Sequence, residues 1–162
     1  MIIDITVNDQ PKRLQARSGD RLVDVLRKEL SLSSLFSDCL SGRCGRCFIF
    51  LDGRLAHSCL IPAFKAKGST IVTYEALRET VEAREIIAAL EKAQALPCAF
   101  CKTGKIMAII DLLARNPLPA EEEILEQLEM VSCPCTDPVS LIAAVGIAAE
   151  LRNKRKFNRA DK

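Results

Sequence analysis

Aromatic residues are scarce in this chain, and their scarcity narrows the functions it can have. Among 162 residues there is no tryptophan, one tyrosine and six phenylalanines. Proteins that bind single-stranded nucleic acid stack bases on aromatic side chains set among basic ones. In the basic C-terminal segment, aromatic residues do not alternate with the lysines and arginines. We therefore expect no nucleic-acid binding.

Long apolar runs are also missing. No stretch approaches the roughly 20 residues that a membrane-spanning helix needs. The first residues, Met1 to Asp4, have neither the basic segment nor the apolar segment of a secretion signal. Hydrophobic residues make up 49% of the chain and its formal charge is +2, which is typical of a globular protein. We expect a cytoplasmic protein without a membrane span.

The patterns of a self-contained enzyme are absent as well. The chain has a single histidine, and it shows no Ser/His/Asp arrangement, no phosphate-binding glycine loop and no pair of catalytic carboxylates. We predict no catalytic residues and no substrate chemistry on this polypeptide.

Cysteine, in contrast, is abundant, and the eight cysteines form two groups of four. The first group has the spacing C-x4-C-x2-C-x11-C, which is the plant-type [2Fe–2S] ferredoxin pattern. Glycines between the first three ligands allow the backbone to turn sharply close to a cluster. A zinc site more often has two paired C-x2-C units. The spacing therefore predicts a [2Fe–2S] cluster held by Cys39, Cys44, Cys47 and Cys59.

The second group is a C-x2-C followed much later by a C-x-C. Each pair precedes an expected helix, so two helix N-termini, with free N–H groups and positive dipole ends, would approach one anionic site. Zinc could use the same four ligands, but the neighbouring ferredoxin-like loop favours a redox centre. We predict a second [2Fe–2S] cluster held by Cys98, Cys101, Cys133 and Cys135. A disulfide framework is not expected, because such clusters of cysteines in a reducing compartment are more often metal ligands.

Hydrophobic periodicity changes along the chain and predicts an α+β protein. Residues 1–76 read as strand, strand, helix, cysteine loop, strand and strand, which fits a β-grasp ferredoxin domain. Residues 77–151 contain four amphipathic stripes, which predict an all-α four-helix domain. Residues 152–162 form a basic C-terminal tail.

The tail concentrates positive charge. The last twelve residues hold six lysines and arginines and one acid, among them Arg152, Lys154, Arg155, Lys156 and Arg159. Such a run could dock an acidic partner. The simpler interpretation, which we prefer, is a solvated and partly disordered end.

The cysteine motifs and their surroundings resemble the iron–sulfur subunit of molybdenum hydroxylases, the group that includes xanthine dehydrogenase, aldehyde oxidase and carbon monoxide dehydrogenase. The resemblance covers nearly the whole chain up to the basic tail. Its motifs are Cys39–Cys47 (CLSGRCGRC), Ser58–Ala63 (SCLIPA), Cys98–Cys101 (CAFC) and Cys133–Cys135 (CPC).

The resemblance implies the iron–sulfur subunit of an oxidoreductase complex, not catalytic alone, with two [2Fe–2S] clusters. It implies two partners, a large molybdopterin-binding subunit together with an FAD-binding subunit. Electrons would pass from molybdenum to the helical-domain cluster, then to the ferredoxin-type cluster, and on to FAD.

One departure from the family pattern leaves alternatives open. The family commonly has glutamine before the first cysteine of the helical domain, where its amide contacts the pterin, but this chain has Pro97. Proline has no side-chain amide and no backbone N–H. The alternatives are a two-cluster carrier for a redox partner without molybdenum and an interaction module that holds structural zinc.

Overall fold

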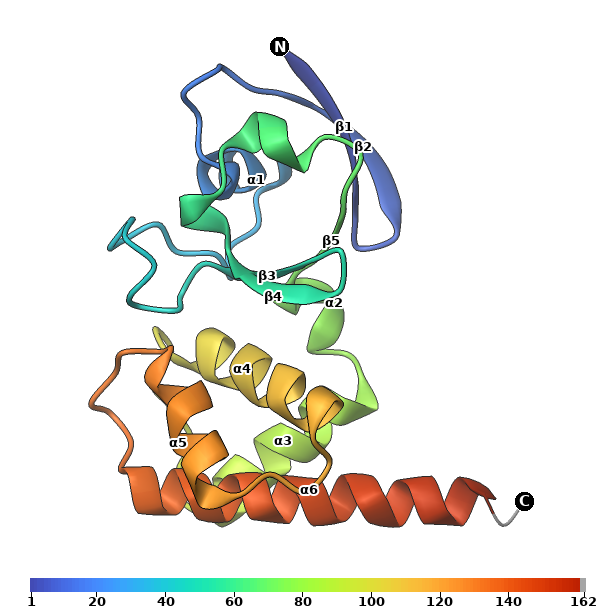
Figure 1. The fold of residues 1–162 in the computed structure, drawn as a ribbon, viewed down its shortest axis with the longest axis vertical. Helices are drawn as coiled ribbons and strands as arrows, with labels where there is room; N and C mark the ends of the chain where they lie inside the picture. The colour runs from blue at the N-terminus through green and yellow to red at the C-terminus, as the bar shows by residue number, and fades with distance from the viewer. Residues whose placement is uncertain (161–162) are drawn as a thin grey trace. The chain divides into compact units, whose positions relative to one another are not determined.

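The computed structural model describes the backbone of residues 1–160 and the side chains of residues 1–157. Its internal contacts divide the chain into two compact units, Met1–Leu77 and Arg78–Lys162 (Figure 1).

The first unit is built on a mixed five-stranded sheet. Its strands follow the order β2-β1-β5-β3-β4, with β1 parallel to β5 and the remaining pairs antiparallel. This is the expected β-grasp arrangement. The strands are β1 (Ile2–Val7), β2 (Gln10–Gln15), β3 (Phe48–Leu51), β4 (Arg54–His57) and β5 (Thr70–Val72).

Alternating side chains of β1 form one side of the core. Ile3, Ile5 and Val7 are buried, because successive residues of a strand point to opposite faces. The β1–β2 turn has positive φ at both Asn8 and Asp9 (51° and 62°), as a tight hairpin turn between twisted strands requires. The apolar face of helix α1 (Leu22–Leu30) belongs to the same core.

Short helical segments complete the first unit, and the sequence did not predict them. Two 3-10 turns, Ser58–Leu60 and Ala63–Ala66, follow β4, and the one-turn helix α2 (Tyr74–Leu77) follows β5. The first of these turns carries Cys59, the last cysteine of the first group.

The second unit contains the four expected helices. They are α3 (Val81–Lys92), α4 (Lys102–Arg115), α5 (Glu121–Glu129) and α6 (Pro138–Ala160). Helix α4 is buried on most sides, from Gly104 through Ile109. Helix α6 packs mainly along α3, as the long red helix in Figure 1 shows.

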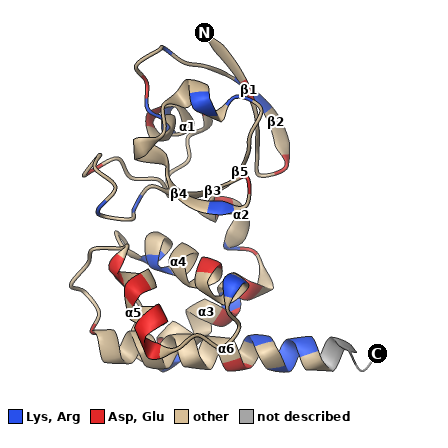
Figure 2. Ribbon diagram, viewed as in Figure 1, with Lys and Arg blue, Asp and Glu red and all other residues tan. Residues whose placement is uncertain are grey.

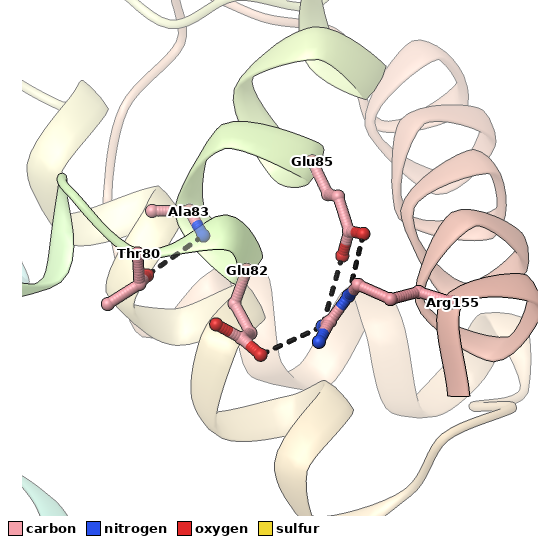
Figure 3. A network of polar contacts seen from close by, with 5 residues as sticks. All are labelled: Thr80, Glu82, Ala83, Glu85 and Arg155. Atoms are coloured by element: carbon pink, nitrogen blue, oxygen red, sulfur yellow. Dashed lines mark hydrogen bonds and ion pairs between the residues drawn. The ribbon is translucent and has the colours of Figure 1, made fainter. Parts of the chain in front are cut away.

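A network of charged side chains joins the far part of α6 to the start of α3 (Figure 3). The Arg155 guanidinium donates to Glu82 (Nη2–Oε1, 2.8 Å) and to Glu85 (Nε–Oε1, 2.9 Å). Arg155 and Glu85 are both half-buried, so the pair is screened less than an exposed one. Thr80 Oγ1 accepts from the Ala83 N–H and caps α3.

This network corrects the expectation of a partly disordered tail. Residues 152–160 continue α6 as regular helix, and Arg155 is engaged within the unit. Lys154 and Lys156 are exposed, and Figure 2 shows the basic residues gathered along this part of α6. The side chain of Arg159 and residues 161–162 lie outside the described residues. Within residues 1–160, no helix is long and apolar enough to cross a membrane.

Candidate metal centres

The first cysteine group lies in the loop between α1 and β3 and in the turn after β4. Cys47 and Cys59 are buried, whereas Cys39 and Cys44 are half-buried. Electrostatic contacts link Cys39 with Cys44 and Cys47 with Cys59. The loop and the turn are separated along the chain by strands β3 and β4, so long-range contacts must hold them together.

Backbone pairing of β3 with β4 places Phe48 opposite His57 and so brings Cys47 close to Ser58, and two polar side chains add further contacts. Arg21, just before α1, donates from Nη1 to the carbonyl oxygens of Leu40 (2.7 Å) and Cys59 (3.0 Å). Ser58, which is fully buried, donates from Oγ to the Cys47 carbonyl oxygen at 2.6 Å. Both residues therefore join the loop to the segment that carries Cys59. No sequence pattern predicts either contact, because the partners are distant along the chain.

Two glycines allow the first cysteine loop to turn sharply. Gly42 and Gly45 have φ values of 72° and 67°, in the left-handed region where residues with a Cβ are strained. At Gly42 an added Cβ would also lie 2.6 Å from Leu60 Cδ1. This confirms the sequence-based expectation that these glycines permit sharp turns.

The loop backbone directs N–H groups toward sulfur. The Ser41 N–H chiefly, with those of Cys44 and Arg43, lowers the pKa of the Cys39 thiol to about 6 although burial acts against it. At the inner end of the loop the balance reverses, because burial raises the pKa of Cys47 to about 12. N–H groups directed at sulfur are the contacts that stabilise anionic thiolate ligands.

The second cysteine group lies at two helix starts. Cys98 and Cys101 precede α4, and Cys133 and Cys135 precede α6, as predicted. The four sulfur atoms all lie within 4.8 Å of one another. The Cys98 N–H also points at Cys135 Sγ, at a distance of 3.3 Å.

Cys101 and Cys133 are joined as a disulfide, which the sequence analysis did not expect. Sulfur atoms gathered this closely can bond to one another as well as to a metal. A sulfur cannot do both at once, so for Cys101 and Cys133 the disulfide and metal ligation exclude each other. Cys98 and Cys135 are exposed and take no part in this disulfide.

A buried lysine accompanies this group, and the sequence analysis missed it. Lys105 is one helical turn after Cys101, and its backbone N–H donates to the Cys101 carbonyl (3.0 Å). Its Nζ donates to the Leu128 carbonyl oxygen at 3.1 Å. The sequence does offer one indication of its role. Lys105 is a charged residue next to an apolar run, and it comes four residues after Cys101, so both lie on the same helix face.

Both groups offer four cysteine sulfurs and so fit a [2Fe–2S] cluster by donor type, because thiolates are the ligands of such clusters. The convergence of all four sulfurs within 4.8 Å of one another is a feature of the second group. In the first group the fit rests on a loop whose N–H groups face sulfur and whose glycines leave room for close approach.

Comparison with known proteins supports the same chemistry. Residues 73–146 match the model of the [2Fe–2S] binding domain family. A nicotinate dehydrogenase subunit from Pseudomonas putida is 36% identical, over 94% of this chain and 97% of that protein. The chain belongs to the iron–sulfur subunit family of the molybdenum hydroxylases. It is an iron–sulfur electron-transfer subunit of that group, which confirms the resemblance and the predicted fold class.

Solved structures agree with this family assignment. The crystal structure of quinoline 2-oxidoreductase from Pseudomonas putida 86 matches 95% of this chain and 96% of its own chain, with a TM-score of 0.84 and 32% identity. Aldehyde oxidoreductase from Desulfovibrio desulfuricans matches 94% of this chain with a TM-score of 0.81 and 31% identity. Only 17% of that longer chain is covered, so in that protein the equivalent region is part of a larger polypeptide.

Proposed function

We propose that this chain carries two [2Fe–2S] clusters and relays electrons between the other subunits of a molybdenum-hydroxylase complex. Cys39, Cys44, Cys47 and Cys59 would hold one cluster, and Cys98, Cys101, Cys133 and Cys135 the other. When bound, each cluster accepts and releases one electron at a time. The observation that carries the proposal is the convergence of four cysteine sulfurs within 4.8 Å at the start of α4 and α6.

The polypeptide contributes by holding and shielding the clusters. Arg21 and Ser58 fix the two segments of the first site relative to each other. Cys47 and Cys59 are buried, whereas Cys39 lies nearer the surface. The exposed side chains of Leu60 and Phe64, with Cys59, line a cavity of about 450 Å³. Electrons would leave or enter at this apolar edge, where a partner can exclude water.

The partners that we propose are a large molybdopterin-binding subunit together with an FAD-binding subunit. They follow from family membership and from the near-complete match to separate small subunits. We also propose a reducing compartment, the cytoplasm, because the Cys101–Cys133 disulfide would remove two ligands of the second cluster.

Cysteine variants test the assignment of the two sites. After anaerobic purification and reduction, the parent protein should give two distinct [2Fe–2S] signals by electron paramagnetic resonance. Cys47→Ser should remove one signal and Cys101→Ser the other. A single signal in the parent, or loss of the same signal in both variants, would contradict the proposal.

A second candidate is a two-cluster carrier whose redox partner lacks molybdenum. Pro97 favours it, since this buried residue directly precedes Cys98 and offers no amide to a pterin. Purification of the native complex, followed by molybdenum analysis of the bound subunits, separates the candidates. Iron-loaded protein recovered only with subunits that lack molybdenum would support the second one.

A further inference from the structure

Lys105 is a cation buried beside the second cysteine group. Its side chain is 4% exposed, which is rare for lysine unless the ammonium is paired. Among the described residues, the only hydrogen-bond acceptor of the Lys105 ammonium is the Leu128 carbonyl oxygen, at 3.1 Å. No described carboxylate lies within ion-pair distance of Nζ, so within the described unit no opposite charge neutralises it.

The surroundings of Lys105 connect it to the sulfur atoms. Lys105 and Cys133 line the same cavity of about 300 Å³ at the start of α6. Thr136 lines it too, and its Oγ1 is buried without a hydrogen-bond partner. Glu129 also lines this cavity, but among the described residues it forms no ion pair with Lys105. A cluster held at Cys133 would place negative charge beside this buried ammonium.

Resting on the two-cluster function proposed above, we propose that the Lys105 ammonium raises the reduction potential of the cluster held by Cys98, Cys101, Cys133 and Cys135. One electron enters the cluster on reduction, no bond forms or breaks, and the negative charge of the site increases. A buried cation stabilises the reduced form more than the oxidised form, because the attraction grows with the charge and is weakly screened in the interior. Electron uptake by this cluster is thereby favoured.

A purely structural role is the competing explanation. The Leu128 carbonyl is in the last turn of α5 and also accepts from the Val131 N–H at 3.1 Å. Lys105 would then serve only to donate to this oxygen and join α4 to α5. The two roles separate when the positive charge is removed and a hydrogen-bond donor is kept.

Lys105→Gln makes that change. The full-length protein, loaded with iron, is titrated potentiometrically and followed by electron paramagnetic resonance. We expect one of the two [2Fe–2S] signals to shift to lower potential. At a fixed ambient potential, the ratio of reduced to oxidised cluster should be about tenfold lower, because one positive charge has been removed from a site of moderate effective dielectric constant. A tenfold change equals about 59 mV for one electron. The other signal should stay in place, and Lys105→Arg should keep the parent value.

The matched control is Lys154→Gln, which removes the same charge from an exposed position. Lys154 is sixteen residues after Pro138 on α6, or about 24 Å along the helix, well beyond the Debye length. It should shift neither signal.

Three results would overturn the role of Lys105. The first is that Lys105→Gln shows two intact signals at the parental potentials. The second is that Lys154→Gln shifts a signal by the same amount. The third is that both Lys105→Gln and Lys105→Met lose the iron of this site, which would show that Lys105 is needed for folding. Absence of either signal in the parent protein would instead overturn the two-cluster function itself, and the two failures are thus distinguishable.

Discussion

Glu75 binds Ser34 through both of its carboxylate oxygens. The Ser34 N–H donates to Oε1 at 3.0 Å and the Ser34 hydroxyl donates to Oε2 at 2.7 Å. The Thr73 hydroxyl also donates to Oε2, at 2.6 Å. One carboxylate of α2 thus fixes the segment that leads from α1 into the first cysteine loop.

This arrangement predicts a pH-dependent stability. Burial disfavours ionisation of Glu75, but hydrogen bonds from Thr73 and Ser34 outweigh it and lower its pKa. A carboxyl whose pKa is lower in the folded state stabilises the fold above its ordinary pKa, and this contribution is lost as the pH falls through the folded value. Glu75→Gln should lower the free energy of unfolding at pH 7 by about 1–2 kcal/mol. The free energy of unfolding should also depend less on pH in this variant, as measured by urea unfolding between about pH 3 and pH 7.

Glu29→Gln is the control for that experiment. Glu29 is exposed, and its ion pair with neighbouring Lys28 is a 3.8 Å contact, which is worth little. Equal losses in the two variants would contradict the role of Glu75.

Gly42→Ala should damage the first cysteine loop in two ways. It places a Cβ at a φ of 72°, which costs about 1–2 kcal/mol, and it forces Leu60 to move. Gly53→Ala is the matched variant, since Gly53 has a φ of 80° with no atom within 4 Å of the added Cβ. We expect iron content per chain to fall only in Gly42→Ala, and Leu60→Ala in that background to restore part of it. Equal iron content in both glycine variants would argue against the clash.

Arg21→Gln should loosen the first site without removing a ligand. The change takes away the hydrogen bonds to Leu40 and Cys59, each worth about 1 kcal/mol or more for a charged donor. Iron release to a chelator, followed by visible absorption, should become severalfold faster. Arg17→Gln, at an exposed position in the same segment, should release iron at the parental rate. Unchanged release in Arg21→Gln would show that Arg21 does not hold the site together.

Arg155→Gln should destabilise the helical unit. The guanidinium bridges Glu82 and Glu85, and its removal leaves the half-buried Glu85 without its cation. We expect a loss of about 1–2 kcal/mol, seen as a lower midpoint in chemical unfolding monitored by circular dichroism. Lys156→Gln, at an exposed position one residue on, should change the midpoint little. Identical midpoints for both variants would mean that the network contributes nothing.

The parts of the fold that the sequence predicted are those with local signals. The alternation of Ile3, Ile5 and Val7 predicted β1, and the spacing of the first four cysteines predicted a loop that turns at Gly42 and Gly45. The order of strands and helices was sufficient for the α+β fold class.

The missed features depend on residues far apart along the chain. The basic end was expected to be partly disordered because its charge run has no local partner, yet Arg155 pairs with Glu85, 70 residues away. Arg21 and Cys59 are 38 residues apart. From the sequence alone, Lys105 would be taken for a surface charge, because its burial depends on the packing of α5 against α4.

Metal and sulfide analysis of anaerobically purified parent protein decides whether both cysteine groups hold iron. We expect about four irons and about four acid-labile sulfides per chain, a red-brown visible spectrum and little zinc. Colourless protein that contains zinc, or protein with half that iron and a Cys101–Cys133 disulfide, would contradict the two-cluster function.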